Sequence, residues 1–272
     1  MIDRVAQGAG RYHIAFAIPA CAMSRVVNIA AYKFVTLDGL PALREHLLTR
    51  AEALSLKGTI LLAPEGINVF LAGEAGAVDA MLAEMSALPA IGPLEVKYSD
   101  SASVPFGRLR VRIKREIIRM DHPAIRPGKG RAPSVDSQTL ARWLAQGADD
   151  EGRPIALLDT RNDFEVDAGT FDGAIDWRLQ RFTQFPAAFD AHRAELEGKT
   201  VVSFCTGGIR CEKAALYMQD AGLQHTYQLE GGILKYFEET GGVGYTGGCF
   251  VFDERETLDA ALAPRPLGAQ AA

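Results

Sequence analysis

The chain has 272 residues, a length that suits two domains of ordinary size. Hydrophobic residues make up 48% and charged residues 23% of it, as in soluble globular proteins, and no apolar run approaches the roughly 20 residues of a membrane-spanning helix. The net charge of −5 excludes a protein that binds polyanions over its whole surface.

Residues 1–24 stand apart from the rest of the chain. They hold a short apolar patch that ends in Ala20-Cys21-Ala22, but the charged start is weak and the apolar core is too short for a signal peptide. We therefore predict that this segment is disordered or lies upstream of a natural start at Met23.

Residues 25–120 contain alternating runs of strand and helix type. In chain order the pattern predicts a strand, a helix, two strands that form a hairpin, a second helix and a fourth strand, at residues 26–34, 41–54, 59–63, 67–71, 78–88 and 94–98. This βαββαβ order is that of the ferredoxin-like α+β fold. Alternating apolar and basic residues from Leu109 to Lys114 predict one further strand at the end of this domain.

Residues 121–134 are rich in proline, glycine and basic side chains, which predicts a linker. Strands and helices alternate again over residues 135–245, so we expect a doubly wound α/β domain whose parallel sheet carries helices on both faces. Residues 246–272 follow it as a C-terminal extension. In such a sheet the active site lies beyond the carboxyl ends of the strands.

The most informative segment is the loop after the predicted strand at 200–204. It reads Cys205-Thr206-Gly207-Gly208-Ile209-Arg210 and leads into a predicted helix at 211–221. Loop amides and a helix N-terminus favour an anion, and a thiolate is one, so we expect the pKa of Cys205 to be depressed. Gly207 and Gly208 allow the backbone to curl, and Arg210 adds a fixed positive charge. The loop thus predicts an activated nucleophile at Cys205.

Three other residues fall at predicted strand ends: Asp159, Arg161 and Glu230. We expect Asp159 to hold Arg161 and neighbouring loop amides in place rather than to act as a catalytic acid. Cys211 follows the loop directly, and both a sulfur-resolving role and a place in the core fit its position. The histidines show no metal-ligand spacing and no G-x-G-x-x-G motif follows a strand, so no metal, haem or flavin site is predicted.

Positive charge gathers in residues 100–131, although the chain as a whole is acidic. Alternation places Arg110, Arg112 and Lys114 on one face of the last strand of the first domain. Arg108 precedes them, and Phe106 offers a surface on which a base can stack. This arrangement predicts an RNA-binding surface. The alternative is a solvated edge strand that its charges protect from aggregation.

Three segments resemble rhodanese domains. Asp159–Glu165 is similar to their first signature, and the loop Cys205–Arg210 resembles their active-site loop, which carries sulfur as a cysteine persulfide. Leu229–Gly232 resembles their closing motif. Three further phrases extend the resemblance to the bacterial rhodanese-domain family of tRNA uridine hydroxylases: residues 30–34, 61–68 and 249–255. The resemblance covers nearly everything from about residue 25 to residue 256.

The resemblance implies an oxygen-dependent conversion of the wobble uridine of certain tRNAs to 5-hydroxyuridine, with Cys205 as the active-site cysteine. It implies an enzyme that binds the tRNA anticodon arm, uses molecular oxygen as co-substrate and works with a donor of sulfur or electrons. The four cysteines are scattered along the chain and favour a reducing cytoplasm. Some members carry a cysteine-rich stretch after the phrase that ends at Arg255. This chain has no cysteine beyond Cys249, so a C-terminal metal site has no support.

Two other functions fit the same loop. A rhodanese-type sulfurtransferase would pass sulfur from a Cys205 persulfide to a small acceptor or to tRNA. An RNA-binding or persulfide-sensing module would bind tRNA without forming a product. A phosphatase fits less well, because the related phosphatase loops usually carry one more residue between cysteine and arginine.

Overall fold

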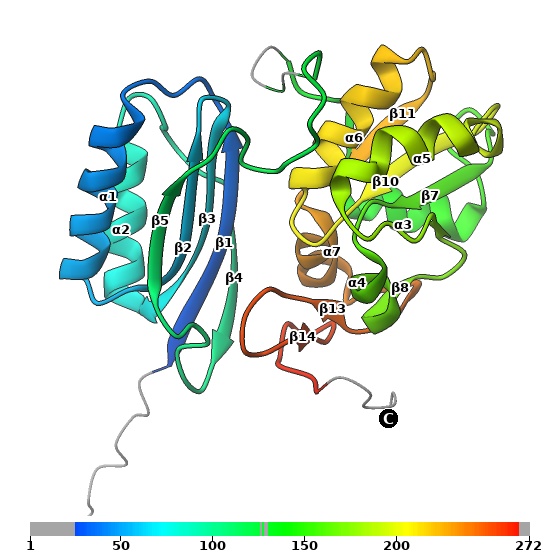
Figure 1. Cartoon of the computed structure of the whole chain (residues 1–272). Coiled ribbons are helices and arrows are strands. Elements are labelled where there is room, and N and C mark those ends of the chain that lie inside the picture. Colours follow the sequence, from blue (N-terminus) through cyan, green and yellow to red (C-terminus); the bar gives the residue numbers. More distant parts are fainter. Residues whose placement is uncertain (1–24, 126, 128–129, 267–272) are drawn as a thin grey trace, which may run out of the picture.

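The computed structural model describes residues 25–125, 127 and 130–266 of the chain. Two α/β halves face one another across a central gap in the ribbon, and the last part of the chain runs beneath the C-terminal half and the gap (Figure 1). The prediction for residues 1–24 lies outside the described residues, as do positions 126 and 128–129 of the predicted linker. No helix in the described ranges is long and apolar enough to cross a membrane.

The N-terminal half is a five-stranded sheet with two helices on one face (Figure 1). Its elements are β1 (Val26–Phe34), α1 (Leu40–Ala53), β2 (Lys57–Ala63), β3 (Gly66–Glu74), α2 (Ala75–Ala87), β4 (Val96–Ser101) and β5 (Leu109–Ile113). The strands lie in the order β4-β1-β3-β2-β5, and only the β2–β5 pair is parallel. The predicted ferredoxin-like order and its added edge strand are confirmed. β4 starts two residues later than expected, because its pairing with β1 begins at Val96, opposite Ala31.

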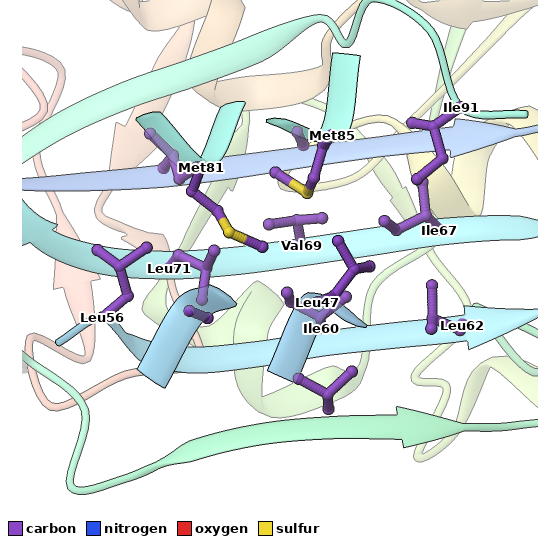
Figure 2. Packing of buried hydrophobic residues seen from close by; sticks show 14 of the residues in the cluster. Leu47, Leu56, Ile60, Leu62, Ile67, Val69, Leu71, Met81, Met85 and Ile91 are labelled. Carbon is purple, nitrogen blue, oxygen red and sulfur yellow. The ribbon is translucent and has the colours of Figure 1, made fainter. Parts of the chain in front are cut away.

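Strand alternation decides which side chains the helices cover. The side chains of β2 and β3 that face α1 and α2 form the core of this half with residues of those helices (Figure 2): Leu47, Ile60, Leu62, Ile67, Val69, Leu71, Met81 and Met85. The residues between them on the strands therefore point to the opposite face. Neither α1 nor α2 covers that open face, and it turns toward the C-terminal half (Figure 1).

The C-terminal half is a parallel five-stranded sheet in the order β6-β11-β10-β7-β9. Its elements are β6 (Ser134–Val135), α3 (Ser137–Gln146), β7 (Ile155–Asp159), α4 (Asp163–Ala168), β8 (Gly169–Phe171), β9 (Ile175–Asp176), α5 (Phe185–His192), β10 (Thr200–Phe204), α6 (Ile209–Asp220), β11 (Thr226–Leu229) and α7 (Gly232–Thr240). Apolar residues of α3 and α7 pack on one face, and those of α5 and α6 on the other. The doubly wound α/β prediction is confirmed.

The extension after α7 is built onto both halves. β12 (Tyr245–Gly247) pairs with β8, and β13 (Cys249–Phe250) pairs with β14 (Thr257–Leu258). The Arg255 guanidinium donates to Ser99 Oγ at 2.7 Å, and the Glu254 amide donates to the Pro105 carbonyl at 3.1 Å. The extension therefore fixes one end of the gap between the halves.

Helix α6 joins the halves at the other side. Lys213 is almost fully buried, and its Nζ lies 2.9 Å from Glu65 Oε1 and 2.6 Å from Glu116 Oε2. One residue earlier, Glu212 accepts a hydrogen bond of 2.9 Å from the Tyr32 hydroxyl of β1. Because α6 starts where the cysteine loop ends, these contacts hold that loop against the open face of the N-terminal sheet.

Candidate active site

A cavity of about 490 Å³ lies between the open face of the N-terminal sheet and the cysteine loop. This volume falls within the range usual for small-molecule sites. Strands β1, β3 and β4 supply one wall, and the opposite wall includes Cys205, Thr206, Gly207, Ile209 and Arg210. Residues 251–253 of the extension line it as well. The cavity therefore exists only because the two halves and the extension come together.

Cys205 follows β10 directly and borders the cavity, although its side chain exposes no surface to water. The Gly208 amide donates to Cys205 Sγ at 3.2 Å. Cys211 Sγ lies 3.9 Å from Cys205 Sγ and 3.0 Å from the Gly208 carbonyl oxygen. The loop thus surrounds the sulfur with polar hydrogens, as an anion requires.

The surroundings of Cys205 favour the thiolate. Burial raises the pKa of Cys205, but the Cys211 thiol, the Arg210 charge and the amides of Arg210 and Cys211 outweigh burial and lower that pKa to about 5. Burial and the neighbouring Cys205 sulfur raise the pKa of Cys211 well above the ordinary value of a thiol. At neutral pH the pair is therefore a thiolate beside a thiol.

The titration of Cys205 can be measured directly. We expect the ultraviolet absorbance of its thiolate, taken as wild type minus Cys205→Ser, to stay constant from pH 8 to about pH 6 and to disappear as the pH falls through about 5. The sign follows from the depressed pKa, because only protonation below it removes the charge. A transition near pH 8.5, where free thiols titrate, would contradict the prediction that the loop stabilises the Cys205 thiolate.

Arg210 does not present a free charge to the cavity. Its Nη1 and Nη2 donate to the two carboxylate oxygens of Glu165 at 2.6 and 2.7 Å, and both side chains are buried. Burial raises the pKa of Glu165, but the Arg210 charge and its hydrogen bonds outweigh burial and lower it. The sequence predicted the charge of Arg210 but not this partner. The pair ties the end of the cysteine loop to α4.

Two glycines, one in the loop and one beside it, are required by geometry. Gly208 has φ 101°, and a Cβ there would lie 2.9 Å from the Tyr32 hydroxyl. Gly232 has φ 69°, and a Cβ there would lie 2.5 Å from the Cys205 carbonyl oxygen. Gly207 has no positive φ, and a Cβ there would meet nothing within 4 Å. Only Gly208 therefore needs the backbone freedom that was predicted for both loop glycines.

The strand-end residues Asp159, Arg161 and Glu230 do not line the cavity. Asp159 accepts hydrogen bonds from the Arg161 amide at 3.0 Å and from Arg161 Nη2 at 2.6 Å, and both side chains are buried. Arg161 Nη2 also donates to the Gly169 carbonyl at 2.6 Å, which fixes the start of β8. Glu230 instead pairs with Lys235 at 2.9 Å and stays partly exposed.

The predicted RNA-binding residues separate into two places. Phe106 borders the cavity, whereas Arg108, Arg110, Arg112 and Lys114 do not. We call these four residues the basic edge. Because Val111 packs into the core beneath the helices, alternation turns Arg110 and Arg112 to the open face of the sheet.

The basic edge carries uncompensated charge. No member forms an ion pair with another described residue. The charge of Arg108, followed by desolvation and the charge of Arg112, lowers the pKa of Arg110. The open face of the sheet therefore has two parts: the cavity wall, and the positively charged basic edge at β5.

Several cavity residues were not predicted. Tyr32, Asn68 and Lys97 come from the N-terminal sheet, and Phe252 comes from the extension, where 56% of its surface is exposed. A polar residue within a buried strand is the signal that would have found Asn68. Within the described residues no group of three or more His, Cys, Asp or Glu side chains is placed to hold a metal ion.

The fold and the loop define a rhodanese-like domain joined to an acylphosphatase-like domain. Two family models match accordingly: "UPF0176 acylphosphatase like domain" over residues 26–117 and "Rhodanese-like domain" over residues 140–239.

Relatives extend this assignment to nearly the whole chain. It is 70% identical to a tRNA uridine(34) hydroxylase of Bordetella avium over 88% of this chain and 99% of that protein. A protein of the same name from Bordetella petrii is 67% identical over 92% and 99%, and one from Variovorax paradoxus is 64% identical over 92% and 95%. The chain belongs to the tRNA uridine(34) hydroxylase family.

Proposed function

We propose that this protein hydroxylates the wobble uridine of tRNA, at position 34, to 5-hydroxyuridine in an oxygen-dependent reaction. The observation that carries the proposal is the position of Cys205, whose sulfur accepts a hydrogen bond from a loop amide at the wall of a cavity of about 490 Å³ and whose pKa is lowered to about 5. That cavity has room for a base that has been turned out of the anticodon loop. We further propose that the protein acts in the cytoplasm.

The proposed role of Cys205 is to attack the pyrimidine ring. Addition of the thiolate, or of a persulfide that a sulfane-sulfur donor has formed on it, to C6 raises the electron density at C5, which takes up O2 as a hydroperoxide. Two electrons from a donor cleave the O–O bond and release water, and loss of the C5 proton then expels the sulfur nucleophile from C6. Conversion of uridine and O2 to 5-hydroxyuridine and water also consumes two electrons and two protons. The proposal therefore includes an electron donor as a second partner besides tRNA.

The basic edge is proposed to hold the phosphates of the anticodon arm. Replacing both Arg110 and Arg112 by alanine is expected to weaken binding of an anticodon stem-loop and to reduce the slope of log K against log salt by about 1–2. Fluorescence anisotropy at several salt concentrations measures both. The matched control is Arg142→Ala, because Arg142 is exposed but paired with Asp150. An unchanged slope in the double variant would remove the basic edge from the RNA interface.

The direct test of the proposed function uses purified protein, unmodified tRNA, oxygen and a reductant. Mass spectrometry of nucleosides and of anticodon fragments is expected to find 5-hydroxyuridine at position 34, and to find none when oxygen is excluded. If the wild-type protein forms no such product with any reductant, the proposal fails.

Sulfur transfer is the second candidate, because the loop amides around Cys205 and its low pKa suit a persulfide as well as a thiolate. This alternative predicts that labelled sulfur passes through Cys205 to an acceptor while the tRNA nucleosides do not change. A binding or sensing module predicts tRNA binding that does not depend on Cys205, and no product.

A further inference from the structure

The open face of the N-terminal sheet buries three polar side chains. Asn28, Asn68 and Lys97 are 2%, 7% and 6% exposed, and all three border the cavity. A polar group that is buried without a partner costs about 1–3 kcal/mol. Each of these side chains therefore needs either a partner within the protein or one that enters the cavity.

Two of the three have partners in the protein. Asn28 Nδ2 donates to the Ser99 carbonyl at 3.2 Å and to Ser101 Oγ at 3.0 Å. Lys97 Nζ lies 3.3 Å from Glu95 Oε1. The carboxamide of Asn68, in contrast, makes no hydrogen bond to any described residue. It is the one member of the set whose polar atoms are left for a ligand.

The position of Asn68 places it across the cavity from the cysteine loop. Its neighbours Ile67 and Val69 face the core beneath the helices, so alternation turns Asn68 to the cavity. Its partner in the β1–β3 register is Tyr32, whose hydroxyl is so close to the loop that a Cβ on Gly208 would lie 2.9 Å from it. Phe70, two residues along β3, adds an aromatic ring to the same wall.

The chemistry of a carboxamide matches one edge of uracil. A carboxamide presents an acceptor and a donor side by side. The imide edge of uracil presents the complementary pair, the N3–H donor and the O4 acceptor. In the pyrimidine ring N3 lies opposite C6, so a base whose N3–H and O4 meet Asn68 turns C6 away from the sheet and toward the loop of Cys205.

We propose that Asn68 binds the imide edge of the target uracil and so orients C6 toward Cys205. This assignment rests on the proposed function, because it takes a uridine in RNA as the ligand. Asn68 acts as a substrate-binding residue: it contacts the base and leaves the phosphates to the basic edge.

The test compares two anticodon stem-loops that differ at position 34, one with uridine and one with 3-methyluridine, in which a methyl group replaces the N3 hydrogen. Binding is measured by fluorescence anisotropy without reductant, so that no turnover occurs. Wild type is expected to bind the uridine stem-loop about 10-fold more tightly, in line with one bidentate contact to a base. Asn68→Leu and Asn68→Ser are both expected to bind the two RNAs equally.

Asn28→Leu is the matched control. It removes a buried amide from the same face, but one already bonded to Ser99 and Ser101. It is expected to lower the melting temperature and to keep the preference for uridine, whereas Asn68→Leu keeps the melting temperature and loses the preference. Equal binding of both RNAs by wild type, or a full preference in both Asn68 variants, would overturn the assignment. Product formation by wild type is scored separately, so failure of Asn68 recognition is distinguishable from failure of the hydroxylase proposal.

Discussion

Cys205→Ser is expected to abolish the formation of 5-hydroxyuridine, with a loss of more than about 10³-fold in kcat, as is typical when a catalytic nucleophile is removed. A serine hydroxyl fits the same loop and can accept the Gly208 amide, but it does not ionise near neutral pH. The variant therefore loses the thiolate but keeps the conformation of the loop. Nucleoside mass spectrometry of reacted tRNA measures the product, and the melting temperature reports whether the fold survives.

The control for this variant is Cys249→Ala. Cys249 is equally buried, but it does not border the cavity, and burial raises its pKa to about 12. Its removal is expected to leave kcat within a few-fold of wild type, because no reactive thiolate is lost. Full activity of Cys205→Ser would refute a nucleophilic role for the loop, and equal loss in both variants would point to damage of the fold.

The elements that local patterns specify were predictable from the sequence. The alternation of Ile67, Val69 and Leu71 with the residues between them marks β3 as a strand with a covered face. The loop at Cys205 combines a buried strand, glycines and a helix start within about ten residues. In both cases the physical cause lies within one segment of chain, so a single sequence suffices.

The partners across the site were not predictable, because each is set by how distant segments pack. Glu165 precedes Arg210 by 45 residues, and nothing in the local pattern of α4 marks it as the counter-ion of the loop. Tyr32 meets the loop only because α6 is anchored to the first half through Lys213. Phe106 and the basic edge were predicted as one surface, but the loop before β5 turns Phe106 into the cavity.

Glu165→Gln is expected to destabilise the protein by about 3–5 kcal/mol, the usual cost of breaking a buried ion pair by removing one partner. Both side chains are nearly or fully buried, so the Arg210 guanidinium would keep its charge without a counter-ion or the solvent to replace it. Urea unfolding followed by circular dichroism measures the loss. The control is Glu197→Gln, whose ion pair with Arg193 is exposed and is expected to contribute no more than about 1 kcal/mol.

The pH dependence of this effect separates the ion pair from packing. The pKa of Glu165 is lowered in the folded state, so its contribution is complete above the ordinary pKa of a glutamate and is lost as the pH falls through the lowered value. The difference in unfolding free energy between wild type and Glu165→Gln is therefore expected to shrink below about pH 4. A packing defect would give a difference that does not depend on pH. Because the same guanidinium lowers the pKa of Cys205, removal of its counter-ion is also expected to shift the thiolate titration to lower pH. That second shift would link the ion pair to the chemistry of the loop.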